Sequence, residues 1–155
     1  MSKLIGGRIG DMKPNLNLLY KSFNKLAFDN KLPLNVIEID SKAKMNRNGN
    51  CYCAYFNTND KKIYFIKEYI DSIKPSVKTA TKWKLWGSLN SFMIHEMTHL
   101  YLWLNGHNAS CHDIKFWRTY REKLECAGVK SFKLDWASSK VATKIFASYK
   151  PGRKI

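Results

Sequence analysis

The chain has 155 residues, of which 45% are hydrophobic and 14% aromatic. That is enough apolar surface for one folded domain, which excludes a disordered polypeptide. Lysine and arginine number 27 against 12 aspartate and glutamate, so the formal net charge is +15. An excess of this size favours a polyanionic partner, nucleic acid before an anionic membrane. We expect a single domain over 1–155, with loose ends at about 1–12 and 150–155.

The sequence contains no run of roughly 18 apolar residues that could span a membrane, and its start is too polar and short for a secretory signal. The cysteines stand at positions 51, 53, 111 and 126 and form no dense framework. This pattern predicts reduced, mostly buried thiols. We therefore expect a cytoplasmic protein, associated with DNA or the nucleoid, that is neither secreted nor bound to a membrane.

The first half of the chain predicts one helix followed by three short strands. The helix begins after the N-cap Asn15 and continues to about Asp29. Its apolar positions recur at helical spacing and comprise Leu16, Leu19, Phe23, Leu26 and Ala27. Runs rich in β-branched and aromatic residues follow at 34–40, 51–56 and 62–66, separated by the polar loop 42–50 and the turn 57–60. One helix followed by a small three-stranded antiparallel sheet indicates an α+β domain.

The second half predicts three helices. The first covers about 77–104, could be divided at Gly87-Ser88, and ends at Asn105-Gly106. Its core-facing stripe comprises Trp86, Met93, Met97, Leu100 and Leu104. Ser110, with Asp113 three residues later, resembles a capping box that starts the next helix, which ends at Gly128. A last helix is predicted near 136–149.

All four histidines lie between positions 95 and 112, and two belong to the segment His95-Glu96-Met97-Thr98-His99. This H-E-x-x-H pattern is typical of zinc hydrolases. Residues four apart share one face of a helix, so both imidazoles can reach a single ion. Glu96 lies in a strongly apolar run, where an ionised carboxylate is costly unless a cation or hydrogen bonds compensate. The pattern predicts one Zn²⁺ with Glu96 beside it as general base.

A catalytic zinc needs a third protein ligand and an open position for water. Spacing alone does not choose among four candidates, which are His107, His112, Glu122 and Glu125. The variant H-E-x-x-H-x-x-G-x-x-H is excluded, because neither position 102 nor position 105 fits it. Spacing also leaves open which group would stabilise an oxyanion; the candidates are Tyr101, Tyr120 and His107.

Two flanking segments make the pattern more specific. An F-N-x-x-x-F-x-x-x-L-P sequence occupies 23–33, and a Phe-Trp pair at 116–117 follows His112. Over about 15–125 the chain resembles the SprT-like metallopeptidases, which include the Spartan proteases that act on proteins crosslinked to DNA. The resemblance implies a zincin-like fold, one zinc held by His95, His99 and His112, and hydrolysis of DNA-associated or DNA-crosslinked proteins. The chain departs from the family at Asp113, where a glycine is common, and in having no C-terminal zinc ribbon.

Basic clusters with interleaved aromatic residues suit single-stranded nucleic acid, because bases stack while phosphates pair with the cations. Residues 112–155 carry eleven lysines and arginines against four acidic residues. The candidate contacts are Lys42, Lys44, Arg47, Lys82, Lys84, Arg118 and Arg121. We expect a protein substrate and DNA, preferably single-stranded, as partners. Two alternatives stay open: a nucleic-acid-binding module with a structural zinc, and a small zinc peptidase indifferent to DNA.

Overall fold

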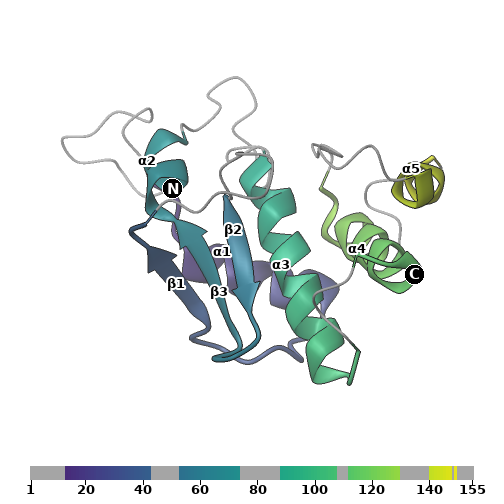
Figure 1. Cartoon of the computed structure of the whole chain (residues 1–155), viewed down its shortest axis with the longest axis horizontal. Helices are drawn as coiled ribbons and strands as arrows, with labels where there is room; N and C mark the ends of the chain where they lie inside the picture. The colour runs from purple at the N-terminus through teal and green to yellow at the C-terminus, as the bar shows by residue number, and fades with distance from the viewer. Residues whose placement is uncertain are drawn as a thin grey trace.

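The structure is a computed structural model that describes residues 13–42, 53–73, 88–107, 112–129, 140–147 and 149. In these segments five helices and three strands form an α+β arrangement, as predicted: the sheet packs on α3, α4 lies on the far side of α3, and α5 packs on α4 (Figure 1). The elements in chain order are α1 (Leu16–Ala27), β1 (Ile37–Asp40), β2 (Ala54–Asn57), β3 (Lys62–Ile66), α2 (Lys67–Ser72), α3 (Ser88–Leu104), α4 (Ile114–Ala127) and α5 (Lys140–Phe146).

The sheet is mixed, so the prediction of a wholly antiparallel sheet was wrong. Its strand order is β1-β3-β2, with β2 antiparallel and β1 parallel to β3. One strand position, about 5 Å wide, separates β1 from β2. The tight turn after β2 then returns β3 into the gap, which makes β3 parallel to β1. Alternating hydrophobicity marks strands but carries no information on their direction.

Helix α1 begins at an asparagine N-cap and ends where the backbone becomes left-handed. The Asn15 carboxamide accepts from the backbone N–H of Leu18 at 3.1 Å, as the predicted N-cap requires. The helix ends at Ala27, two residues earlier than predicted, because Asp29 and Asn30 adopt left-handed backbone angles of φ 52° and 58°. Leu26 is 42% exposed, so it does not belong to the buried stripe that we predicted.

The F-N-x-x-x-F-x-x-x-L-P segment forms a folded corner at the end of α1. The buried Asn24 carboxamide donates to the carbonyl of Leu32 at 3.0 Å and accepts from its N–H at 3.1 Å. Phe23 and Phe28 lie in the core on either side of this contact. The hydroxyl of Tyr20 donates to the carbonyl of the proline that ends the segment. The motif therefore turns the chain from α1 towards β1.

Helix α3 is the central helix of the fold. It is buried on several faces, because the sheet covers one side and α4 and α1 cover others. Met93, Met97 and Leu100 are fully buried as predicted, whereas Leu104 is 49% exposed at the helix end. The short helix α2, which directly follows β3, was not predicted. The expected first part of a longer helix, 77–87 with Trp86, lies outside the described residues.

Helix α4 begins later than predicted, at Ile114, with Asp113 rather than Ser110 as its N-cap. The prediction of Ser110 as the start was therefore wrong: the Asp113 carboxylate caps the helix itself by accepting from the N–H of Phe116 at 2.9 Å. Gly128, with φ 70°, ends the helix as predicted. The described part of the last helix, α5, is shorter than the predicted 136–149.

Among the described residues, no helix is both long and apolar enough to cross a membrane. Cys53 and Cys126 are half-buried. Cys51, Cys111 and the predicted loose ends at about 1–12 and 150–155 lie outside the described residues.

Candidate metal centre

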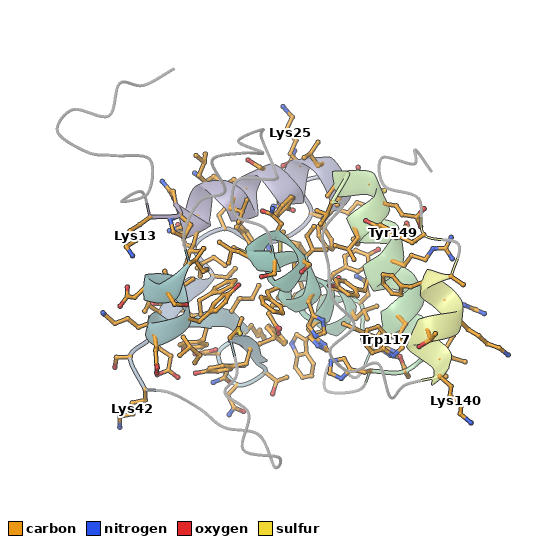
Figure 2. The ribbon with its side chains drawn as sticks, turned by 90° about the horizontal axis from the view of Figure 1, so that it is seen from above. Lys13, Lys25, Lys42, Trp117, Lys140 and Tyr149 are labelled. Atoms are coloured by element: carbon orange, nitrogen blue, oxygen red, sulfur yellow. The ribbon has the colours of Figure 1, made fainter. Side chains whose placement is uncertain are left out.

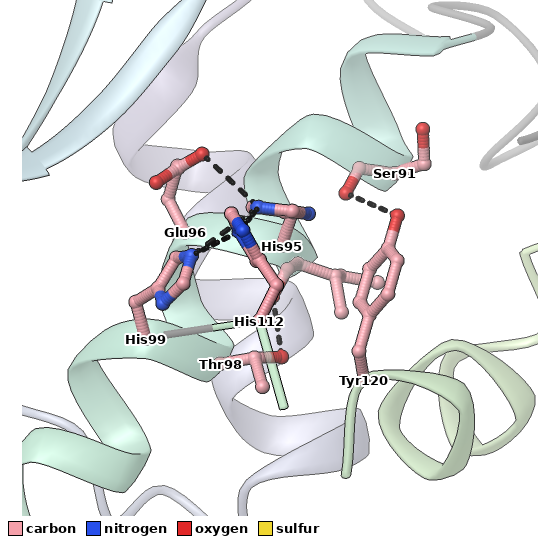
Figure 3. Close-up of polar contacts among 8 residues, drawn as sticks. Ser91, His95, Glu96, Thr98, His99, His112 and Tyr120 are labelled. Atoms are coloured by element: carbon pink, nitrogen blue, oxygen red, sulfur yellow. Dashed lines mark hydrogen bonds and ion pairs between the residues drawn. The ribbon is translucent and has the colours of Figure 1, made fainter. Parts of the chain in front are cut away.

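Three imidazoles, two from α3 and one from the residue before the N-cap of α4, converge on one point beside α3 (Figure 3). The Nε2 atoms of His95 and His99 are 3.3 Å apart, and they lie 3.2 and 3.1 Å from Nε2 of His112. We call these three atoms the histidine triangle. His99 is buried, His95 half-buried and His112 exposed, so the triangle lies where solvent can reach it. In the part of the chain that the structure describes, no other group of His, Cys, Asp or Glu has a comparable arrangement.

The shape of the histidine triangle matches a metal site. Three nitrogens held about 2.05 Å from one ion at tetrahedral angles lie about 3.3 Å apart, close to the observed edges. Each Nε2 carries either one proton or one lone pair, so three of them meeting at a point cannot all satisfy one another. A metal ion accepts all three lone pairs at once. The three histidines could therefore hold a metal ion.

The local structure explains how each ligand is placed. His95 and His99 are one turn apart on α3 and share a face, as predicted. His112 lies just before the N-cap of α4, outside the helix, whereas we had expected it inside the first turn. Aromatic rings of α4 support the imidazoles: Phe116 stacks on His99 with centroids 4.4 Å apart, and Trp117 stacks on His112 at 5.5 Å.

The carboxylate of Glu96 lies beside the histidine triangle and not in it. One carboxylate oxygen is 3.9 Å from Nε2 of His95, and the residue is only 7% exposed. Burial raises the pKa of Glu96 to about 8, although the backbone N–H of Phe56 on β2 donates to the carboxylate and lowers it. Burial, helped by the neighbouring imidazoles, also lowers the pKa of His95 well below its usual range. His95 is therefore in the neutral form that binds metals.

His107, one of the four candidate third ligands, is engaged elsewhere. Its Nε2 donates to Oδ2 of Asp113 at 2.9 Å. The capping hydrogen bond from Phe116 and the adjacent imidazole hold the pKa of Asp113 below its usual value, so its carboxylate is ionised and accepts from both partners. His107 is thus tied to the start of α4 and lies outside the histidine triangle.

Both glutamate candidates are paired within α4. Glu125 is buried and accepts from Nε of Arg121 at 2.8 Å, while Glu122 lies 4.0 Å from the amine of Lys123. Neither carboxylate belongs to the three-histidine group. Of the four candidates left open by spacing, the structure brings only His112 to His95 and His99.

The tyrosines considered for oxyanion stabilisation have other contacts. The hydroxyl of Tyr120 donates to the backbone carbonyl of Ser91 on α3 at 3.2 Å, and the residue is fully buried (Figure 3). The ring of Tyr101 packs against Phe28, with the amine of Lys123 4.7 Å from its centre. Tyr120 therefore supports α3 behind His95, and Tyr101 belongs to the contact between α1, α3 and α4.

Only three of the predicted nucleic-acid contacts fall on described residues. Lys42 and Arg118 are exposed, and Figure 2 shows Lys42 pointing outward at the periphery with Lys13, Lys25 and Lys140. Arg121 instead turns inward, where it pairs with Glu125 and donates to the carbonyl of Ile145 at 2.8 Å. The remaining candidates lie outside the described residues and are Lys44, Arg47, Lys82 and Lys84.

Sequence reasoning missed two contributors to the site. The backbone amide of Phe56 reaches Glu96 only because β2 lies at the sheet edge beside α3, and no side-chain pattern reports that position. The pairing of Asp113 with His107 was also missed. An aspartate next to His112 is a signal for an N-cap, but its second partner depends on how the loop closes.

Comparisons of the chain with protein-family models, with curated proteins and with solved structures found no match.

Proposed function

We propose that this chain is a zinc-dependent peptidase of the SprT-like type, with a zincin-like fold, that hydrolyses DNA-associated or DNA-crosslinked proteins. One observation carries the proposal: a histidine triangle of metal-site dimensions lies next to a buried carboxylate from the intervening residue of the same helix. In a structural zinc site four protein ligands complete the coordination, and a neighbouring carboxylate is not required. Three ligands and a neighbouring base are the arrangement of a catalytic one.

Zinc suits the donors better than the other common divalent ions. Mg²⁺ and Ca²⁺ prefer oxygen ligands, whereas the three donors here are imidazole nitrogens. Zinc is commonly four-coordinate and takes three histidines readily, with the fourth position open. The exposed position of His112 is consistent with an open side of the site. We therefore assign His95, His99 and His112 as the residues that would hold Zn²⁺.

In hydrolysis, a bound zinc, the Glu96 carboxylate and the N–H of Phe56 would have different roles. A bound zinc supplies Lewis acidity towards the scissile carbonyl and makes water nucleophilic near neutral pH. The positive charge of a bound zinc would favour the ionised form of Glu96 against the effect of burial. The carboxylate then accepts the proton of the attacking water and donates it to the nitrogen of the departing amine, so the general base is regenerated. The N–H of Phe56 and the buried surroundings hold this carboxylate in place between the two transfers.

An extended peptide fits alongside β2. Within the described residues β2 is an edge strand, and the hydrogen bond from the N–H of Ile66 to the carbonyl of Cys53 sets which of its residues face β3. By alternation, Ala54 and Phe56 direct their backbone groups to the opposite edge, towards α3 and Glu96. A substrate strand added there would place its backbone beside the general base.

The charge of the molecule supports the DNA-associated part of the proposal. A net charge of +15 creates a potential that attracts phosphates, and exposed cations such as Lys42 and Arg118 are available for contact. Binding through phosphates is independent of sequence and weakens steeply as salt rises. We expect affinity for a single-stranded oligonucleotide to fall at least tenfold between 50 and 200 mM salt, measured by fluorescence anisotropy. Affinity that stays flat over this range would favour the DNA-independent peptidase.

The variant Glu96→Gln tests the catalytic assignment. It should keep one equivalent of zinc and the wild-type melting temperature but lose at least a thousandfold of peptidase activity, because the amide cannot accept the proton. Glu122→Gln is the matched control, since this exposed carboxylate is outside the site and its removal should leave cleavage unchanged. Full activity of Glu96→Gln would remove Glu96 from its role.

The ligand assignment is tested by zinc content. His112→Ala should lose stoichiometric zinc, whereas Glu122→Ala should retain it, as measured by elemental analysis after dialysis. A protein that holds zinc with four protein donors and cleaves nothing would instead be the nucleic-acid-binding module with a structural zinc. Zinc retained by His112→Ala would contradict the proposed ligand set.

A further inference from the structure

The third histidine has a weaker local anchor than the other two. His95 and His99 are fixed by the regular backbone of α3, but His112 precedes the N-cap of α4 and lies outside any helix. It is also exposed, so close packing on all sides does not hold it. A metal triangle with edges of 3.1–3.3 Å nevertheless requires its Nε2 to be placed within a few tenths of an ångström.

The residue after His112 is Asp113, and its carboxylate contacts both α4 and the segment that follows α3. Oδ1 of Asp113 accepts from the N–H of Phe116 at 2.9 Å and caps α4. Oδ2 of the same side chain accepts from Nε2 of His107 at 2.9 Å. The two oxygens thus have separate tasks: one fixes Asp113 on α4, and the other ties it to the chain segment that follows α3.

His107 is itself rigidly connected to α3. Its backbone N–H donates to the carbonyl of Leu102 at 2.9 Å, and the N–H of Gly106 donates to the carbonyl of Trp103 at 3.0 Å. With Gly106 at φ 80°, these two bonds form the Schellman motif that ends the helix. The position of His107 is therefore set by the last turn of the helix that carries the other two histidines.

We infer that the His107–Asp113 pair, hereafter the clamp, is a positioning device that holds His112 in register with His95 and His99. Through the clamp, the last turn of α3 sets the position of Asp113, the residue next to the third ligand. Neither residue of the clamp belongs to the histidine triangle, so both act through His112. The inference rests on the proposed zinc site and adds a role for the histidine that the site leaves unused.

The substitution Asp113→Ser separates the two tasks of the carboxylate. Serine is a good N-cap, so α4 keeps its first hydrogen bond, but its single hydroxyl oxygen cannot also hold His107. The pair His107→Phe and His107→Gln tests the other side: phenylalanine keeps a ring without a donor, while the glutamine amide can still donate to Asp113. Lys115→Gln is the matched control, an exposed substitution in the first turn of α4.

Zinc affinity, measured by competition with a chromogenic chelator, should fall 10- to 100-fold in Asp113→Ser and His107→Phe. His107→Gln should recover most of the loss, and Lys115→Gln should match the wild type. The visible absorption of the Co²⁺-loaded protein should change in the two weakened variants, because this spectrum reports coordination geometry and is insensitive to general stability. Wild-type affinity and spectrum in both would overturn the clamp, as would equal losses in His107→Gln and His107→Phe.

The outcomes separate this inference from the proposed function. If the wild-type chain binds zinc and the clamp variants bind it equally well, the clamp has no positioning role and the zinc site stands. If the wild-type chain binds no zinc, both proposals fail together. Should Asp113→Ser not fold, the comparison of the two His107 variants decides.

Discussion

At the scale of single residues, polar side chains hold the chain where it leaves regular structure. Asn24 brackets the backbone of Leu32, and Asp113 caps one helix while binding the segment that follows another. A buried backbone group must find a partner inside the protein when water is excluded. These side chains therefore determine where the loops run, and the loops determine where residues such as His112 lie.

Asn24→Ala should lower the free energy of unfolding by about 3 kcal/mol, because two buried hydrogen bonds are lost and both polar groups of Leu32 are left unsatisfied. Chemical denaturation monitored by circular dichroism measures the change. Ser22→Ala is the control on the same helix: its exposed hydroxyl bonds only to the preceding turn, and the expected change is within about 0.5 kcal/mol. Equal effects of the two substitutions would show that the corner contributes no special stability.

At the scale of the elements, packing decides which side chains remain exposed for contact with a partner. Arg118 and Arg121 are three residues apart on α4 and look equivalent in sequence, yet one is exposed and the other is enclosed by α5. The inward residue neutralises the buried Glu125 and binds the backbone of α5. The same principle places β2 at the sheet edge, where its outward backbone groups meet α3.

Replacing each arginine by methionine should separate these roles. Arg121→Met should destabilise the protein by about 3 kcal/mol, because the buried Glu125 carboxylate loses its charged partner. Arg118→Met should leave stability within about 0.5 kcal/mol and weaken oligonucleotide binding by a small factor. Chemical denaturation measures the stability of both variants, and anisotropy titrations measure their oligonucleotide binding. The reverse pattern would mean that Arg121 is a nucleic-acid contact and the α5 contact is dispensable.

Ala54→Pro tests the edge strand. The N–H of Ala54 faces away from β3, so proline removes no ladder hydrogen bond within the sheet but does remove a donor that a substrate strand would use. We expect kcat/KM on a peptide substrate to fall about tenfold, with zinc content unchanged. Ala54→Ser keeps the donor and should retain activity. An unchanged kcat/KM in the proline variant would place the substrate elsewhere.

At the scale of the whole molecule, the histidine triangle lies where α3 and the start of α4 meet, two helices that also contact each other by packing, by the clamp and by the hydrogen bond from Tyr120 to Ser91. Its ligands come from α3 and from the start of α4, with the undescribed 108–111 between them. An ion that binds these three atoms binds the folded state and not the unfolded chain, so it stabilises the fold.

Saturating zinc should therefore raise the melting temperature. With free zinc a thousandfold above its Kd, the stabilisation is about 4 kcal/mol, which corresponds to roughly 10 °C for a chain of this size. Differential scanning calorimetry with zinc and with EDTA measures the shift, and His112→Ala should lose most of it. A melting temperature that is identical in zinc and in EDTA would argue against a site formed between α3 and α4.

The sequence by itself determined the α+β class, the third strand to the residue, the first N-cap, and the face of α3 that carries His95, Glu96 and His99. These features depend on local periodicity and capping, which neighbouring residues encode. Only the tertiary structure decided the direction of β1, the choice of His112 over His107 and the glutamates, and the inward turn of Arg121. Each of these depends on how a loop closes or which element covers a face, and such contacts join residues that are distant in the chain.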